Sequence, residues 1–376
     1  MHDALKAVVL SNVNSITLLS LLKICTGCQN ILKKYKKEFE IDLNHVVSLV
    51  DDDLKYFKGV GFINLSGCSN ITDIGVSYLE NVNGVNLDWC KKITDKGLYH
   101  LKNTSCLSFA GNEFITDIGL SYLENIDDIS IYSASKITDA GLIYLKKAKK
   151  IRISFCDISD AGLAHLEKVK KIRLLSCYIS DAGLAHLKNA THIYIDLCED
   201  ITDKGLSYIK NVKSFRCNGG IITDLGLSYL KNIEYIDLQD CKNIKDDSLK
   251  YLKNVKKIRL NGCNITDAGL AYLKNAETVH ISRCYNITDN GLKYLKNVKM
   301  LNIACCNITN IGLSYLENIK TIDIRECRKI TNDGLRYLQD VSKIYITNKF
   351  DEEYISKNTV VVKTGWLFWD LPFDLE

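Results

Sequence analysis

The sequence predicts an α/β repeat solenoid, and two observations support this fold class. A phrase of the form Ile-Thr-Asp begins at Ile71 and returns every 21 or 22 residues as far as Ile330, and a weaker copy starts at Leu49, which makes fourteen units. Within each unit the spacing of apolar residues changes from that of a helix to that of a strand. A unit this short cannot bury its own apolar face, so the units must stack and share one core.

The first half of each unit predicts a short helix. The third place of the phrase is Asp in twelve units and Asn in two (Asn310 and Asn332), and we expect these side chains to cap the helix by accepting hydrogen bonds from its free N–H groups. Apolar residues three apart, such as Leu270 and Leu273, then share one helical face. The helix commonly ends at Lys-Asn or Glu-Asn, since Asn tolerates left-handed backbone.

The second half of each unit predicts a short strand followed by a cysteine. Ile258 and Leu260, for example, are alternate residues that point inward from one strand. Ten of the fifteen cysteines lie three residues beyond the last apolar strand position, and we expect them to form a buried ladder of reduced thiols. They are Cys68, Cys90, Cys156, Cys177, Cys198, Cys241, Cys263, Cys284, Cys306 and Cys327.

The repeat resembles the cysteine-containing class of leucine-rich repeats over about four fifths of the chain. The resemblance is carried by runs such as Val255-x-x-Ile258-x-Leu260-x-x-Cys263-Asn264-Ile265-Thr266-Asp267-x-Gly269-Leu270-x-x-Leu273. It implies a leucine-rich-repeat solenoid, or horseshoe, with parallel strands on the concave face and short helices on the convex face. Because these units are shorter than is usual for the family, we expect short helices and tight curvature.

The fourteen units fall within residues 37–349, and the N-terminal segment before them, residues 1–36, predicts a helical cap. Its run Ile16-Thr17-Leu18-Leu19-Ser20-Leu21-Leu22-Lys23-Ile24-Cys25, followed by Cys28-Gln29-Asn30-Ile31-Leu32, resembles the second half of an F-box, although the usual Leu-Pro opening is absent. The resemblance implies an F-box/leucine-rich-repeat protein that docks a Skp1-type adaptor. Its adaptor-binding residues would be Leu18, Leu19, Leu22, Ile24 and Ile31. The alternative is a plain helical cap.

The C-terminal segment, residues 350–376, predicts a second cap. Thr359–Lys363 has the composition of a terminal strand, and Trp366, Phe368, Trp369 and Phe373 would form an aromatic plug that seals the open end of the solenoid. A docking tail is the alternative for these aromatic residues.

Composition favours a globular protein of the cytoplasm, with the nucleus as the alternative. The net charge is only +4, no apolar run is long enough to span a bilayer, and the N-terminus lacks the order of a secretion signal. The cysteine ladder, together with Asn-x-Thr sequences placed in tight turns between coils, favours a reducing compartment. The small charge gives no argument for nucleic-acid binding.

No motif in the sequence predicts an enzyme, a metal site or a cofactor. An aromatic residue or His fills one helical position in all fourteen units, so His100, His165 and His186 belong to the repeat. Cys25-x-x-Cys28 lacks the second pair of ligands that zinc requires. Phosphate loops and the GxSxG and HExxH motifs are absent from the sequence.

The residues that vary between units predict the binding surface, because side chains that flank the inward strand positions face the concavity. Trp89 and Tyr132 are among these positions, and the strongest candidates combine positive charge with aromatic rings. These candidates are Lys150, Arg152, Phe155, Lys171, Arg173, His192, Tyr194, Tyr235, Lys257, Arg259, His280 and Arg283.

The sequence therefore predicts a non-enzymatic solenoid that recognises a protein ligand on its concave face. A substrate receptor of a Skp1–cullin–F-box-type ubiquitin ligase is the leading specific role. A binding scaffold or inhibitor without any ubiquitin connection is the alternative.

Overall fold

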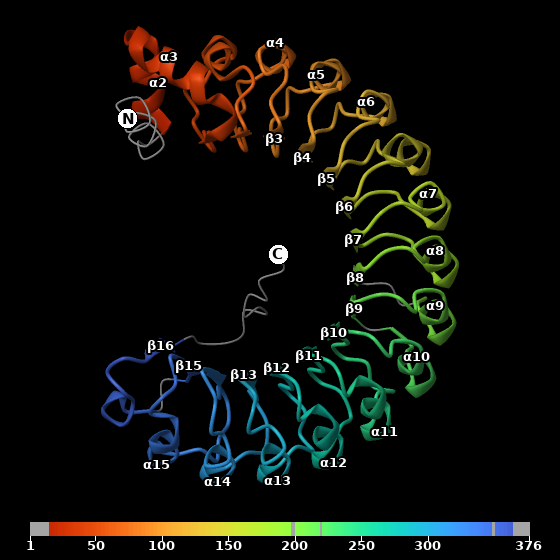
Figure 1. Cartoon of the computed structure of the whole chain (residues 1–376), viewed down its shortest axis with the longest axis vertical. Helices are drawn as coiled ribbons and strands as arrows, with labels where there is room; N and C mark the ends of the chain where they lie inside the picture. The colour runs from red at the N-terminus through yellow and green to blue at the C-terminus, as the bar shows by residue number, and fades with distance from the viewer. Residues whose placement is uncertain (1–14, 197–199, 219, 348–349, 364–376) are drawn as a thin grey trace. The chain divides into compact units, whose positions relative to one another are not determined.

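A computed structural model describes residues 15–196, 200–218, 220–347 and 350–363 of this 376-residue chain. The chain divides into two compact units, Met1–Cys198 and Glu199–Glu376, which are considered separately. In each unit parallel strands pair in chain order, β1 to β8 in the first and β9 to β16 in the second. Figure 1 shows that within each unit the short helices lie on the side of the coils opposite the strands. The predicted leucine-rich-repeat fold is confirmed.

The strands are short. Those of the first unit are β1 (Glu40–Asp42), β2 (Phe62–Asn64), β3 (Gly84–Asn86), β4 (Cys106–Ala110), β5 (Asp128–Tyr132), β6 (Lys150–Ser154), β7 (Lys171–Leu175) and β8 (His192–Asp196). Those of the second unit are β9 (Ser214–Cys217), β10 (Tyr235–Asp237), β11 (Lys257–Arg259), β12 (Thr278–His280), β13 (Met300–Asn302), β14 (Thr321–Asp323), β15 (Lys343–Ile346) and β16 (Val360–Lys363).

The helices of the repeat have about one turn each. The first unit contains α2 (Ser15–Ile24), α3 (Thr26–Tyr35), η1 (Lys36–Glu38), η2 (Asp51–Phe57), α4 (Asp73–Ser77), α5 (Asp95–His100), α6 (Asp117–Ser121), η3 (Asp139–Leu145), α7 (Asp160–Leu163) and α8 (Asp181–His186). The second contains α9 (Asp203–Tyr208), α10 (Asp224–Tyr229), α11 (Asp246–Leu249), η4 (Lys250–Leu252), α12 (Asp267–Leu270), η5 (Ala271–Leu273), α13 (Asp289–Leu292), α14 (Asn310–Leu313), α15 (Asn332–Leu335), η6 (Arg336–Leu338) and η7 (Glu352–Tyr354).

Each coil contributes the same apolar positions to the core. The isoleucine that opens the repeat phrase, the inward strand residues and the helical leucines are all buried, as Ile71, Leu79 and Ile63 illustrate. Burying a side chain of this size contributes about 1.5–3 kcal/mol. Repetition of these positions therefore builds a continuous core within each unit from coils that have none of their own.

The repeated aspartate joins neighbouring coils, and the prediction that it caps its own helix is wrong. The N-cap is the preceding residue: the hydroxyl oxygen of Thr94 accepts a hydrogen bond from the N–H of Lys96 at 3.2 Å. Asp73, in the coil before, accepts two hydrogen bonds from Thr94, one from its N–H at 2.8 Å and one from its hydroxyl at 2.6 Å. The threonine therefore caps its own helix and also binds the carboxylate of the previous coil.

This contact recurs within both units. Its Asp–Thr or Asp–Ser pairs are Asp51–Thr72, Asp73–Thr94, Asp95–Thr116, Asp117–Thr138, Asp139–Ser159, Asp160–Ser180, Asp203–Thr223, Asp246–Thr266, Asp267–Thr288 and Asp289–Thr309. We call this series the aspartate ladder.

The aspartate ladder explains the glycine of the repeat. A Cβ atom at Gly119 would lie 2.5 Å from a carboxylate oxygen of Asp95 and 3.0 Å from the Leu98 side chain. Almost every coil has this crowding, so the glycine is required by the close approach of the carboxylate and not by unusual dihedral angles.

One interior coil breaks both rules together, as the first coil does with Val50 and Asp53. Lys245 stands where the remaining coils have Thr or Ser, and Ser248 stands where they have Gly. The hydroxyl of Ser248 donates a hydrogen bond to Asp224 of the previous coil. The hydroxyl lost at one position is thus replaced from another, and the aspartate keeps a donor.

The cysteine ladder is confirmed at nine of its ten positions, all of them buried thiols that form no disulfide, while Cys198 lies outside the described residues. The thiols of Cys68 and Cys90 donate hydrogen bonds to strand carbonyl groups of the previous coil at 3.1 and 3.0 Å. In the next coil Asn112 occupies the place of the ladder cysteine, and its side-chain amide donates a hydrogen bond to the carbonyl of Cys90 at 2.8 Å. Burial raises the pKa of Cys90 to about 12, so the thiol keeps its proton.

Two elements flank the repeats. At the N-terminus Cys25 caps α3, and an ion pair of 2.7 Å between Lys23 and Asp53 joins α2 to η2. At the other end β16 pairs with β15, which confirms the predicted terminal strand. The predicted aromatic plug, residues 366–373, lies outside the described residues. In the described part of the chain, no helix is long and apolar enough to cross a membrane.

The close approach at the repeat glycine predicts the effect of adding one methyl group. Gly119→Ala should lower the free energy of unfolding by about 1–3 kcal/mol, because its Cβ would press against Asp95 and Leu98. Gly27→Ala is the matched control: its Cβ would meet the Cys25 sulfur at an ordinary 3.6 Å, so alanine should stabilise α3 by about 0.5–1 kcal/mol. Urea denaturation measures both. Equal effects of the two substitutions would contradict the crowding.

Candidate binding surfaces

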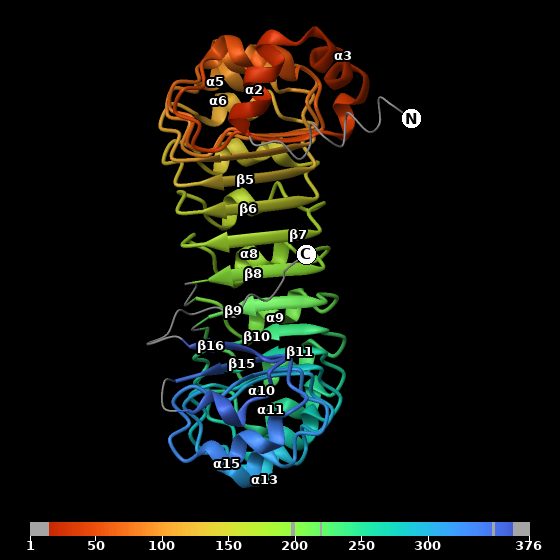
Figure 2. The same cartoon turned by 90° about the vertical axis from the view of Figure 1, so that its left-hand side faces the viewer.

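The first unit arranges the predicted basic residues in two rows across neighbouring strands. Lys150 of β6 is in register with Lys171 of β7, and Arg152 is in register with Arg173. On β8 the same rows continue as His192 and Tyr194. We call Lys150, Lys171, Arg152 and Arg173 the basic rows. Figure 2 shows β6, β7 and β8 side by side, so neighbouring members of a row are about 4.8 Å apart at the backbone.

An acidic residue that the prediction left out of the binding set neutralises one side of the basic rows. Asp128 of β5 lies 3.5 Å from the Lys150 ammonium and 2.9 Å from the Arg152 guanidinium. Arg152 also donates a hydrogen bond to the Ser130 hydroxyl at 2.6 Å. By contrast, the Arg173 side chain makes no hydrogen bond or ion pair with any residue that the structure describes. Positive charge is therefore least compensated at Arg173.

Local charge was a further signal in the sequence. Residues 146–173 contain nine Lys or Arg and three Asp or Glu, a net charge of +6, whereas the whole chain carries +4. The remainder of the chain is therefore net negative. The small total charge hid a concentration of positive charge on two adjacent coils.

An unusual backbone conformation marks the residue before the ladder cysteine. This residue has a side chain and a positive φ in nine coils, including those of Trp89 (62°), Ser133 (49°), Phe155 (54°) and Ser176 (53°), and glycine fills the same place at Gly67, Gly111 and Gly262. The reason is a tight turn: the N–H of Cys90 bonds to the carbonyl of Leu87, which places Trp89 third in the turn. Left-handed backbone costs about 1–2 kcal/mol for a residue with a Cβ atom.

Three exposed aromatic residues lie in the same unit as the basic rows: Tyr132 and Phe155 come from the coils of β5 and β6, and Trp89 comes from the coil of β3. Trp89 lies against Gly111, where a Cβ atom would come within 2.6 Å of the indole ring. The rings of Tyr132 and Phe155 have centroids 6.0 Å apart. Trp89 and Phe155 are each 52% exposed and Tyr132 is 37% exposed. We call these three residues the aromatic shelf.

The second unit contradicts the expectation that outward strand residues are exposed. Arg216, Asp237, Arg259 and His280 occupy one row of register across β9 to β12. Asp237 and His280 are fully buried, and Arg259 is 3% exposed. Tyr235, another predicted binding residue, is also buried and donates a hydrogen bond to Asp237 at 3.2 Å. These side chains pack on one another, so Tyr235, Arg259 and His280 do not present a surface.

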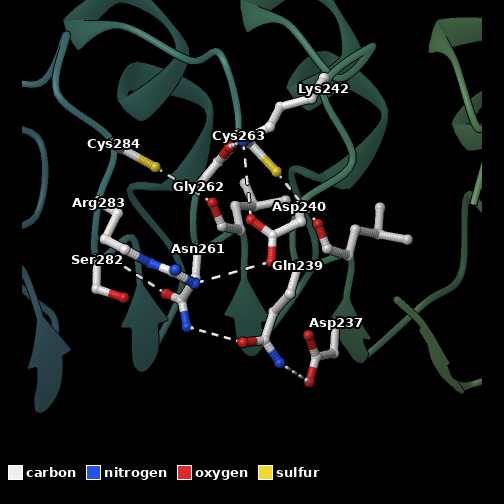
Figure 3. A network of polar contacts seen from close by, with 12 residues as sticks. Asp237, Gln239, Asp240, Lys242, Asn261, Gly262, Cys263, Ser282, Arg283 and Cys284 are labelled. Carbon is white, nitrogen blue, oxygen red and sulfur yellow. Dashed lines mark hydrogen bonds and ion pairs between the residues drawn. The ribbon is translucent and has the colours of Figure 1, made fainter. Parts of the chain in front are cut away.

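Polar contacts continue from this row toward the ends of the strands, as Figure 3 shows. The Gln239 amide donates to Asp237 at 3.4 Å, and the Asn261 amide donates to Gln239 at 3.2 Å. Asn261 in turn accepts from the N–H of Ser282 at 3.0 Å. The chain of amides thus links three successive coils.

An ion pair spans three coils along the same edge (Figure 3). The Arg283 guanidinium lies 3.8 Å from Asp240, and the coil between them contributes Gly262. A Cβ atom at Gly262 would lie 2.5 Å from the Asp240 carboxylate, so glycine makes room for the pair. Of the predicted residues in this unit, Lys257 is exposed and Arg283 is half-buried.

The predicted adaptor-binding residues separate into two groups. Leu18, Leu19 and Leu22 are buried, and therefore belong to the core. Ile31 is half-buried, whereas Ile24, at the end of α2, is 82% exposed. Within the described residues, no group of three or more His, Cys, Asp or Glu side chains could hold a metal ion.

Comparison with known proteins supports the fold. A family profile described as "Leucine Rich repeat" matches residues 251–274 and 294–316. A search of curated proteins found no match to this sequence.

Solved structures of this fold include proteins from bacteria and yeast. An internalin, InlF, from Listeria monocytogenes has a TM-score of 0.57 and 20% identity, and the match covers 78% of this chain and 89% of that chain. A chain of the yeast Rad7–Elc1 complex has a TM-score of 0.54 and 17% identity, with 96% of this chain and 93% of that chain covered. A chain of the TLR13–ssRNA13 complex has a TM-score of 0.56 and 14% identity, with 82% of this chain and about half (53%) of that chain covered.

The buried histidine predicts a pH dependence of stability. Burial, with a smaller effect of Arg259, lowers the pKa of His280 from 6.5 to about 3 in the folded protein. The unfolded chain therefore takes up a proton below pH 6.5 that the folded chain does not, and stability should fall with pH by up to about 1.4 kcal/mol per pH unit until about pH 3.

Urea denaturation at pH 7, 6 and 5 measures this contribution. The stability of His280→Asn should change less with pH than that of the wild type, whereas His186→Asn, on the helical side of the first unit, should retain the wild-type dependence. An unchanged slope for His280→Asn would show that this histidine takes up its proton in the folded state.

Proposed function

We propose that this protein is a non-catalytic recognition module, and that the basic rows of the first unit bind an acidic, partly apolar polypeptide segment. One observation carries the proposal: Lys150 faces Lys171, and Arg152 faces Arg173, directly across paired strands. Like charges placed opposite one another destabilise a sheet. Carboxylates of a bound segment would relieve that repulsion, above all at Arg173.

Protein is favoured over nucleic acid as the partner because the surface mixes charges. Asp128 pairs with two of the four basic residues. This carboxylate would repel a phosphate backbone, whereas a polypeptide can place a basic residue against it. One structure of similar fold is a complex of TLR13 with ssRNA13, so nucleic acid is retained as an outcome of the test.

Charge reversal tests the basic rows. Arg152→Glu combined with Arg173→Glu should weaken binding of poly-glutamate by about 10- to 100-fold, because attraction becomes repulsion, while Lys150→Glu alone should have a small effect. Binding by the wild type should also fall steeply as salt concentration rises. Fluorescence anisotropy with labelled polymer measures both effects.

The matched control is Lys253→Glu with Lys274→Glu, which makes the same change of total charge at exposed residues on the helical side of the second unit. Equal weakening by the two double variants would show that total charge, and not the basic rows, drives binding. Tighter binding of an oligonucleotide than of poly-glutamate would identify nucleic acid as the ligand class.

A second candidate function is the substrate-receptor role in a Skp1–cullin–F-box-type ubiquitin ligase. Two observations support it: the F-box-like sequence of α2 and α3, and the likeness to a chain of a two-protein complex, Rad7–Elc1, over 96% of this chain. In this role α2 and α3 would bind the adaptor while the basic rows bind the substrate. A scaffold or inhibitor, with α2 and α3 serving only as a cap, is the alternative.

The exposed end of α2 separates these roles. Ile24→Asp should abolish capture of a purified Skp1-type adaptor without unfolding the protein, because Ile24 is 82% exposed. Val47→Asp, at a residue 72% exposed on the first coil, is the control and should leave capture intact. Failure of the wild-type protein to bind the adaptor in a pull-down would exclude the ligase role and leave the cap.

A further inference from the structure

The aromatic shelf occupies backbone positions that glycine would fill without steric cost. Trp89 and Phe155 have φ values of 62° and 54°, and the same place is glycine in the coils on either side of Trp89 (Gly67 and Gly111) and serine in the coils on either side of Phe155 (Ser133 and Ser176). Glycine adopts this conformation freely, whereas large side chains rarely do. The chain therefore carries two aromatic residues at places where its own repeat shows that none is needed for folding.

Burial in the fold does not compensate for this conformation. Trp89 and Phe155 each remain about half exposed at 52%, although aromatic residues in a core are fully buried, as Phe109 is on the neighbouring strand β4. Clustered, exposed aromatic side chains are the residues that dominate protein interfaces. The strain and the exposure together indicate that the rings serve a contact outside the chain.

The position of the shelf identifies what it contacts. Tyr132 lies two residues beyond Ser130, and Ser130 is in register with Arg152. Successive outward residues of a strand are about 7 Å apart. This distance between the shelf and the basic rows matches the spacing of alternate side chains in an extended peptide. A segment that places carboxylates on Arg152 and Arg173 would bring a flanking side chain onto Tyr132 and Phe155.

The environment of the shelf favours an apolar side chain at that place. The rings of Tyr132 and Phe155 lie 6.0 Å apart between centroids and are 37% and 52% exposed, so their free faces offer stacking and apolar contact.

We propose that the aromatic shelf is the specificity-determining part of the binding surface, and that it takes an aromatic or large aliphatic side chain next to the acidic residues of the bound polypeptide. This inference rests on the proposed function of the basic rows. The two parts have different roles. The basic rows attract acidic segments in general, and the shelf selects segments that carry an apolar residue beside the acidic residues.

Two polymers of equal length separate these parts, namely poly-glutamate and a random copolymer of glutamate and tyrosine in a ratio of about four to one. The full-length wild-type protein should bind the copolymer at least about tenfold more tightly, because ring stacking is added to charge attraction. Phe155→Gly and Trp89→Gly should each reduce this preference and leave poly-glutamate binding unchanged. Arg152→Glu with Arg173→Glu should weaken binding of both polymers.

Glycine is the chosen replacement because it keeps the backbone conformation. Relief of the left-handed strain and loss of ring contacts oppose each other, so the melting temperature of Phe155→Gly should stay within about 2 °C of the wild type. Ser133→Gly is the matched control: it relieves a φ of 49° at the same position without removing a ring, and should leave the preference unchanged.

The outcomes distinguish the two proposals. If neither polymer binds, the function proposed for the basic rows fails. If the wild type binds both polymers equally, or if the glycine variants keep the tenfold preference, the shelf proposal is overturned while charge recognition stands. A large fall in melting temperature for Phe155→Gly would assign the ring to the fold instead. Tighter binding of single-stranded oligothymidine, lost in the glycine variants, would overturn the polypeptide assignment in favour of nucleic-acid stacking.

Discussion

A carboxylate, or an amide in two coils, at the start of the short helix holds one coil to the next. Asp95 accepts hydrogen bonds from the N–H and the hydroxyl of Thr116 in the following coil, and stands against Gly119. Hydrogen bonds to a charged group are about twice as strong as neutral ones, and this contact satisfies an N–H at a helix start that would otherwise lack a partner. The threonine, aspartate and glycine of the repeat are therefore one interaction, divided between two coils.

The same strand position has a different role in each of the two units. Lys-Ile-Arg occurs at residues 150–152, 171–173 and 257–259, yet the Arg152 side chain is 31% exposed and that of Arg259 is 3% exposed. A buried guanidinium must be balanced by neighbouring groups, as Asp237 does for Arg259. In the second unit such charges lie buried between coils, whereas in the first the Arg152 side chain stays partly exposed while it pairs with Asp128.

Periodicity predicted the fold, the order of helix and strand and the cysteine ladder, because each depends on residues that recur within one unit. The role of the aspartate could not be obtained in this way, since its partner lies 21 residues further on and spacing within a unit shows only that Asp begins a helix. Strand alternation likewise predicts which way His280 faces, but not that Arg259 and its neighbours close over it. The same tripeptide has different exposure in the two units, so the sequence alone does not determine which of these side chains lie on the surface.

The paired substitution at Lys245 and Ser248 shows how such an array can evolve. Every regular coil carries a carboxylate for the coil after it and a hydroxyl with a glycine for the coil before it, so a gene duplication that inserts one complete coil leaves all junctions intact. A partial insertion breaks two of them. Within a coil, a lost hydroxyl must be matched by a second change, as at Ser248. The array can therefore lengthen or shorten in whole repeats. A substitution at a junction between coils, by contrast, requires a second substitution that compensates for it.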